Sequence, residues 1–253
     1  MNEDDAVERN HIEAVTVNHN TSRYTELMLR SLFAQHPSGL NMSITVFDNA
    51  SQDDMAELQT YAEMMGISVV QSGFTTQTEL NSHGEILSRF VLEHPRSTHY
   101  LFLDADVCFI QQDTLHVMLK ELEESMGAFG IGARMARWGG IVEIPQEYRD
   151  KLYDSRLHPC CALVKNTELF RRVVKEIGLS GAKYCWARGE EYLDTFELMT
   201  KVLKTHGLRH VLSSKMVIHF FSVSYDRDSA DVVELKEKRR DELLREYRRA
   251  GAS

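Results

Sequence analysis

The sequence predicts an α/β protein with a mostly parallel sheet, on three observations. Short β-prone runs alternate with segments whose apolar residues recur at helical spacing through the first half of the chain. The connections between them are short, and such alternation makes neighbouring strands parallel, with right-handed crossovers. The 253 residues, 43% of them hydrophobic, are enough for one large domain or two closely fused halves.

The first half of the chain is predicted to alternate strictly between strands and helices. β-branched and aromatic runs bounded by polar loops indicate strands, and apolar residues three or four positions apart indicate helices. The strands are expected at residues 13–17, 43–47, 67–70 and 100–107, and the helices at residues 24–33, 55–65 and 79–94. Pro95 sets the end of the last helix, because the residue before a proline disfavours the helical conformation.

The second half shows a mixed pattern. We expect helices at residues 114–126, 167–177 and 190–205, strands at 129–133, 159–164 and 211–220, and an irregular stretch at 136–154. Residues 1–11 are polar, which predicts a flexible N-terminus. The C-terminal segment 226–253 contains a highly charged helix with a sparse apolar face. This helix could pack on its own domain, lie on a partner or pair two copies of the chain as a homodimer.

Composition excludes several classes of function. The net charge of −9 argues against broad nucleic-acid binding and against attraction to anionic lipid, both of which need a basic surface. No apolar run approaches the ~18 residues of a membrane span, and the N-terminus is acidic, so we expect a cytoplasmic protein without an integral membrane segment. The four cysteines include no Cys-x-x-Cys pair, which favours buried, reduced thiols.

Two carboxylates at the end of the predicted strand 100–107 form the most informative motif. Side chains alternate along an extended segment, so Asp104 and Asp106 point the same way while Ala105 points toward the core. Two like charges this close repel unless a cation lies between them, and Mg²⁺ or Mn²⁺ prefers such oxygen ligands. Phosphate oxygens of a substrate would complete the coordination shell. The alternative for an isolated Asp-x-Asp is a solvated turn.

Polar clusters occupy equivalent places after three of the predicted strands. They comprise residues 18–22, 48–54 and 104–106. Ligands of parallel α/β sheets bind beyond the carboxyl ends of the strands, so the three clusters together predict one binding site.

Five motifs follow one another in a fixed order along residues 13–222. They are Val15-Thr16-Val17-Asn18-His19-Asn20, Phe47-Asp48-Asn49-Ala50-Ser51-Gln52-Asp53, Asp104-Ala105-Asp106, Gly189-Glu190-Glu191 and His219. In this order and spacing the chain resembles family-2 glycosyltransferases with the GT-A fold. The resemblance implies a Rossmann-like nucleotide-sugar half at 12–107 fused to a mixed-sheet acceptor half at 108–225. It also implies an inverting enzyme that moves one sugar from a nucleotide donor, expected to be a UDP-sugar, to a hydroxyl acceptor, with Mn²⁺ or Mg²⁺ as cofactor.

The resemblance assigns ligand contacts to individual residues. Those expected to bind the nucleotide sugar are Asn18, Asn20, Thr21, Asp48, Ser51, Asp104, Ala105 and Asp106. Asp48 would accept a hydrogen bond from a ring N–H of uracil, although an Asp before Asn-Ala-Ser also suits a turn or helix cap. His219 would join Asp104 and Asp106 as a metal ligand, and its alternative is a core histidine in an apolar strand.

A general base is expected at the start of the predicted helix 190–205. An acceptor hydroxyl must lose a proton as it attacks, and a carboxylate on the face opposite the leaving group serves this purpose. Related enzymes place the second acidic residue of a Glu-Asp pair there, which selects Glu191 in this chain. Glutamate is longer than aspartate by one methylene, so Glu190 or Asp194 could act instead. All three would also suit the dipole of a helix N-terminus.

Two other classes of function share the predicted architecture. A sugar-phosphate nucleotidylyltransferase would also use metal, but a glycine-rich, lysine-containing phosphate loop after the first strand is absent, and Asn18-His19-Asn20 stands there. A non-catalytic GT-A scaffold that binds a nucleotide sugar or a protein partner is the third possibility, suggested by the atypical Glu190-Glu191 pair.

Overall fold

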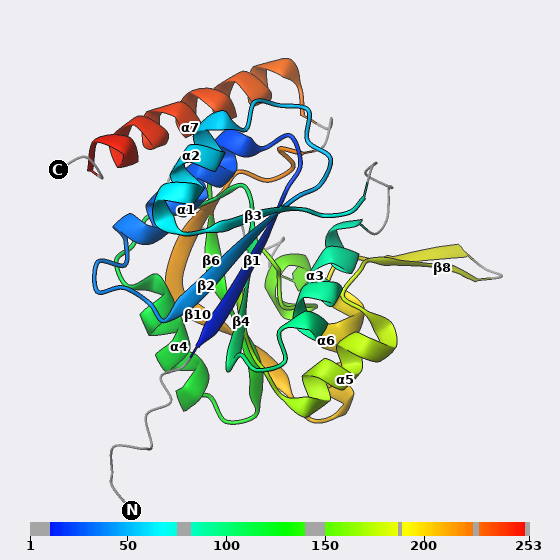
Figure 1. Cartoon of the computed structure of the whole chain (residues 1–253). Helices are drawn as coiled ribbons and strands as arrows, with labels where there is room; N and C mark the ends of the chain where they lie inside the picture. Colours follow the sequence, from blue (N-terminus) through cyan, green and yellow to red (C-terminus); the bar gives the residue numbers. More distant parts are fainter. Residues whose placement is uncertain (1–10, 75–81, 140–149, 187–188, 225–227, 251–253) are drawn as a thin grey trace, which may run out of the picture.

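The computed structural model describes residues 11–74, 82–139, 150–186, 189–224 and 228–250 (Figure 1). The predicted flexible N-terminus therefore lies almost entirely outside the described residues, as do the first residues of the helix expected at 79–94 and most of the irregular stretch 136–154.

An eight-stranded mixed sheet forms the centre of the molecule, in the order β3-β2-β1-β4-β7-β6-β10-β5. The strands are β1 Ile12–Asn18, β2 Met42–Asp48, β3 Ser68–Gln71, β4 His99–Asp104, β5 Val107–Phe109, β6 Ala128–Arg137, β7 Cys161–Lys165 and β10 Arg209–His219. Strands β3, β2, β1 and β4 are mutually parallel, and β6 is parallel to β10. Strand β7 runs antiparallel between β4 and β6, and β5 runs antiparallel to β10. The parallel first half and mixed second half are both as predicted.

Helices cover both faces of this sheet (Figure 1). They are α1 Ser22–Ala34, α2 Ala56–Met65, α3 Ser82–Glu93, α4 Thr114–Glu124, α5 Glu168–Ile177, α6 Glu197–Thr205 and α7 Ala230–Ala250, with a π-helix at Asp150–Asp154. Strand β4 shows why both faces are covered. Leu101 and Leu103 pack in the cluster with α1, α2 and α4, and Tyr100 and Phe102 pack with α3, α5 and α6.

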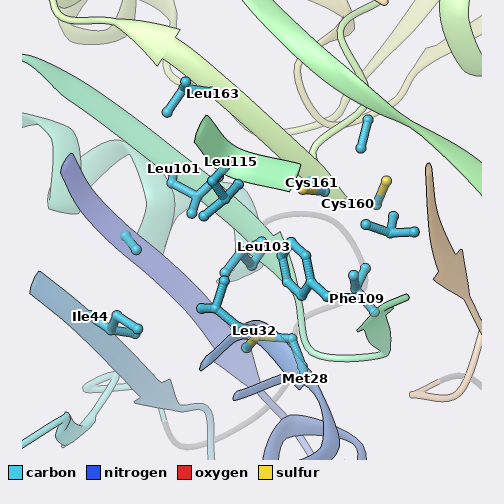
Figure 2. Close-up of a cluster of buried hydrophobic side chains, with 14 of the residues drawn as sticks. Met28, Leu32, Ile44, Leu101, Leu103, Phe109, Leu115, Cys160, Cys161 and Leu163 are labelled. Atoms are coloured by element: carbon cyan, nitrogen blue, oxygen red, sulfur yellow. The ribbon is translucent and has the colours of Figure 1, made fainter. Parts of the chain in front are cut away.

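The larger cluster lies between the sheet and α1, α2 and α4, and Figure 2 shows part of it. Met28 and Leu32 of α1 and Leu115 of α4 are completely buried in it, together with Leu101 of β4. Burying each such side chain contributes about 1.5–3 kcal/mol, so this cluster fixes the strand that leads to Asp104.

One predicted helix is wrong at its start. Residues Gly189–Leu193 form strand β9, which pairs with β8 (Ala182–Trp186) in an antiparallel hairpin, and α6 begins only at Glu197. Glutamate is a good helix former, but intrinsic propensity is a weak determinant, and here cross-strand pairing overrides it. Glu190 and Glu191 therefore do not lie at a helix N-terminus. Strands β5 and β8 were not predicted either.

The C-terminal helix packs on its own domain. Leu243 and Leu244 of α7 are buried in a cluster with Tyr24 and Leu27 of α1. The buried Glu26 carboxylate accepts hydrogen bonds from Arg248, at 3.0 and 2.7 Å. Of the alternatives left open by the sequence, the structure supports this intramolecular packing and gives no support to a homodimer through the helix. Among the helices described, none has the length and apolarity needed to cross a membrane.

Candidate active site

Three predicted metal ligands meet at one edge of the sheet. Asp104 ends β4, Asp106 lies in the turn before β5, and His219 ends β10. His219 Nε2 lies 3.1 Å from Asp106 Oδ1 and 3.5 Å from Asp104 Oδ2. The backbone N–H of Phe220 donates to the carbonyl of Asp106 at 3.0 Å, which joins the two segments. One donor atom from each of the three side chains lies within 4.8 Å of the others.

This geometry fits a divalent cation. An octahedral ion with bonds of about 2.1 Å places adjacent ligand atoms about 3 Å apart, which is close to the separations of His219 Nε2 from the two carboxylates. Burial alone would lower the pKa of His219, but the carboxylates of Asp106 and Asp104 outweigh it and raise that pKa. Burial also raises the pKa of Asp104, against the opposing effect of His219. A proton and a metal ion would therefore compete for this cluster.

A cavity of about 260 Å³ opens above the cluster. Of the residues predicted from the sequence, Thr21, Asp104, Ala105, Asp106, Asp194 and His219 line it. The chain thus brings a candidate metal site and one candidate base to a single cavity.

Other predicted ligand contacts lie beside the cavity and hold its loops. Asn18 is fully buried; its amide N–H donates to Ser51 Oγ at 2.9 Å, and its Oδ1 accepts from Thr25 Oγ1 at 2.7 Å. Ser51 Oγ also accepts from the backbone N–H of Asn20 at 3.0 Å. These contacts tie the loop after β1 to the loop after β2. Asn18 and Ser51 therefore support the loops and line neither described cavity. Asn20 and Thr21 line a neighbouring cavity of about 320 Å³ that reaches α7.

Asp48 is buried at the end of β2, and both of its carboxylate oxygens have partners. Oδ2 accepts from Gln71 Nε2 at 3.0 Å, and Oδ1 lies 3.4 Å from Asn18 Nδ2. Asp48 therefore links the ends of three adjacent strands. Asp48 lines neither of the two described cavities.

The three candidate bases differ in position. Asp194, just after β9, lines the cavity, and its Oδ2 lies 2.8 Å from Arg156 Nη2. Glu191 does not line either described cavity; its half-exposed carboxylate lies 3.4 Å from Lys201 Nζ. Glu190 lies in β9, opposite Cys185 of β8.

Two lining residues that the sequence did not single out are Arg156 and His158. They precede β7, which is antiparallel to β4, and the N–H of Asp104 donates to the carbonyl of Cys160 at 2.9 Å. The start of an antiparallel strand thus reaches the same edge as the ends of its parallel neighbours. Burial and the nearby Arg156 cation hold the pKa of His158 well below its ordinary value. The neutral ring accepts the Cys160 N–H at Nδ1, 3.2 Å away, so Nε2 carries the proton.

His83 enters the cavity from the start of α3, with Nε2 3.9 Å from Asp104 Oδ1. The next residue must be a glycine for α3 to start this close to Ser180. A Cβ atom on Gly84 would lie only 2.3 Å from the Cα of Ser180.

Comparison with known proteins identifies the fold. No protein-family model matches the chain, and no curated protein sequence does. Among solved structures, a mannosyltransferase from Pyrobaculum calidifontis in complex with GDP-Man and Mn²⁺ aligns with a TM-score of 0.58 and 13% identity, covering 96% of this chain and 74% of that one. Residues 1–349 of S. aureus TarS give 0.55 and 15%, covering 95% and 71%. Glucosyl-3-phosphoglycerate synthase from Mycobacterium tuberculosis with Mn²⁺ and UDP-glucose gives 0.52 and 15%, covering 96% and 80%.

These alignments extend over nearly the whole chain and include its mixed sheet. The chain has the GT-A fold of nucleotide-sugar glycosyltransferases, as the sequence motifs predicted.

Proposed function

We propose that this protein is a metal-dependent glycosyltransferase that moves a single sugar from a nucleotide-sugar donor to a hydroxyl acceptor, with inversion at the anomeric carbon. The observation that supports it best is one cavity containing both the Asp104–Asp106–His219 cluster and the carboxylate of Asp194. Such a reaction needs these two functions together: stabilisation of a leaving diphosphate and removal of a proton from the attacking hydroxyl.

Asp104, Asp106 and His219 would hold Mn²⁺ or Mg²⁺. When bound, the ion offsets the negative charge that builds on the leaving diphosphate. His158 would present its Nε2–H to the same cavity, where it can donate to a phosphate or sugar oxygen.

Asp194 is our choice of general base. Its carboxylate would accept the proton of the acceptor hydroxyl while that oxygen bonds to the anomeric carbon. The bond from this carbon to the diphosphate oxygen breaks, and its electron pair leaves with the diphosphate. Position in the cavity favours Asp194 over Glu191, the base suggested by sequence.

The nucleotide of the donor is a separate question from the fold. The mannosyltransferase was solved with GDP-Man and the synthase with UDP-glucose, so fold likeness alone does not select the base of the nucleotide. We propose a UDP-sugar as donor, from the sequence resemblance, and keep the cytoplasmic location expected from the sequence as a proposal.

Calorimetric titration with UDP-, GDP- and dTDP-sugars, each with and without Mn²⁺, tests the proposal. We expect one nucleotide class to bind, and to bind more tightly with Mn²⁺. Release of pyrophosphate from a nucleoside triphosphate and a sugar phosphate would indicate a nucleotidylyltransferase instead. Donor binding without transfer to any hydroxyl, water included, would indicate a non-catalytic scaffold.

A further inference from the structure

We infer that Arg156 is a positioning residue that holds the carboxylate of Asp194 in the orientation needed to accept a proton. This inference rests on the proposed function, because it assumes that Asp194 is the base. Arg156 belongs to the loop before β7, and Asp194 to the corner between β9 and α6, so the contact joins segments far apart in sequence.

The guanidinium of Arg156 contacts two consecutive residues of that corner. Nη2 lies 2.8 Å from Asp194 Oδ2, and Nη1 donates to the carbonyl oxygen of Thr195 at 2.8 Å. A planar fork that makes both contacts fixes the direction of the carboxylate as well as its position. A lysine could supply the charge but only a single point of contact.

Asp194 retains capacity for a substrate despite these contacts. Its Oδ1 accepts from the backbone N–H of Thr195 at 2.8 Å and its Oδ2 contacts Arg156, so each carboxylate oxygen has one protein partner. A carboxylate offers about four lone-pair sites. The side chain is half exposed and lines the cavity, whereas Arg156 is buried beneath it. An acceptor hydroxyl can therefore reach Asp194 while the guanidinium supports it from the protein side.

The same loop also reaches the metal cluster. Two residues after Arg156, the ring of His158 packs edge-on against His219, with ring centroids 5.7 Å apart. Between them, the N–H of Leu157 donates to Thr200 Oγ1 of α6 at 3.1 Å. This short segment thus contacts both the corner that bears the base and the cluster that would hold the metal, and sets the distance between them.

The test compares Arg156→Met with Arg156→Lys, using hydrolysis of UDP-glucose and of GDP-mannose in the presence of Mn²⁺, so that water serves as the acceptor. We expect kcat to fall by about 10- to 100-fold in both variants, since a small misplacement of a catalytic group costs this much. The Kd of the donor, measured by calorimetry, should change less than about threefold, because the guanidinium of Arg156 contacts Asp194 and Thr195 and not the three candidate metal ligands. Added methylguanidinium should restore part of the kcat of Arg156→Met and none of that of Asp194→Asn.

Lys201→Met is the matched control. Lys201 makes ion pairs with Glu191 and Glu197 at the exposed side of the same corner, at 3.4 and 3.2 Å. This variant should keep kcat within about twofold, since exposed pairs contribute little. Wild-type kcat in Arg156→Lys, or a change in the KM of the donor alone, would overturn the positioning role and leave the proposed function intact. Failure of the wild-type protein to bind any nucleotide sugar would instead reject the proposed function.

Discussion

Individual residues of the site fall into two groups that the sequence could not separate. Asp104, Asp106 and His219 were predicted as metal ligands, and the fold brings them together. Asn18 and Asp48 were predicted to meet the nucleotide, yet both side chains are buried among protein partners. A polar residue after a strand has the same appearance in sequence whether it faces a ligand or secures a neighbouring loop, because both roles need a short polar side chain at that place.

The choice among the acidic residues is open to direct measurement. Asp194→Asn should lower kcat by about 10²- to 10⁴-fold with little change in donor binding, the usual contribution of a general base. Glu191→Gln, the matched change outside the described cavities, should remain close to wild type. Steady-state kinetics of donor hydrolysis and transfer would show the difference, and the reverse pattern would restore Glu191 as the base.

The metal cluster predicts how stability responds to pH. Protonated His219 beside two carboxylates has a raised pKa, so its contribution to the stability of the metal-free protein is present below about pH 6.5 and is lost as pH rises through the higher, folded-state pKa. The raised pKa of Asp104 acts in the same direction. We expect the gain in Tm on adding Mn²⁺ to be small near pH 5.5 and larger near pH 8, because metal and proton compete for the cluster. Thermal scans with Mn²⁺ and with EDTA at each pH measure this.

Asp106→Asn should abolish that Mn²⁺-dependent gain in Tm and the turnover that depends on it. Glu124→Gln is a suitable control, since Glu124 is exposed and pairs only weakly with Lys120, at 3.9 Å. Full activity of Asp106→Asn in the presence of EDTA would reject the metal site.

Secondary-structure elements were predicted best where a periodic pattern and a buried face coincide. Strand β4 reads in sequence as a continuous apolar run, and it is buried on both faces. Strand β9 was missed because Gly189–Leu193 has the composition of a helix start, and only its pairing with β8 shows that it is extended. The three-residue strand β5 was missed for a different reason, because its partner β10 is distant in sequence and leaves no local signal.

Helix α7 shows how an element with a weak apolar face can still be integral to the fold. We expect Arg248→Met to lower the free energy of unfolding by about 1–3 kcal/mol, because the buried carboxylate of Glu26 would lose a charge-assisted partner and keep only Arg30. Urea denaturation measures the change. Arg245→Met, an exposed position on the same helix whose Nε donates to a backbone carbonyl, should change it by less than about 0.5 kcal/mol.

At the scale of the whole molecule, the candidate site depends on contacts between the two halves of the chain. Asp104 and Asp106 come from the end of the first half, and His219 and Asp194 from the second. The order of motifs in the sequence predicted this general arrangement. It did not reveal Arg156 and His158, whose place depends on the direction in which β7 is inserted into the sheet.

Because the cluster joins these halves, Mn²⁺ with UDP should slow amide exchange in both at once. We expect protection at residues 104–109 and at 217–221, the backbone segments that flank the cluster, and little change in β3 at the sheet edge. Hydrogen–deuterium exchange followed by mass spectrometry measures this, and protection confined to one segment would contradict a shared ion.

The reversed direction of β7 has a consequence for how such a protein can diversify. The segment ahead of this strand forms part of the cavity wall, while the strand itself keeps its apolar side chains in the core. Because Arg156 and His158 in this segment contact Asp194 and His219, substitutions there would change the cavity wall and the candidate catalytic groups together. The segment therefore has little freedom to diversify while Asp194 and His219 keep their proposed roles.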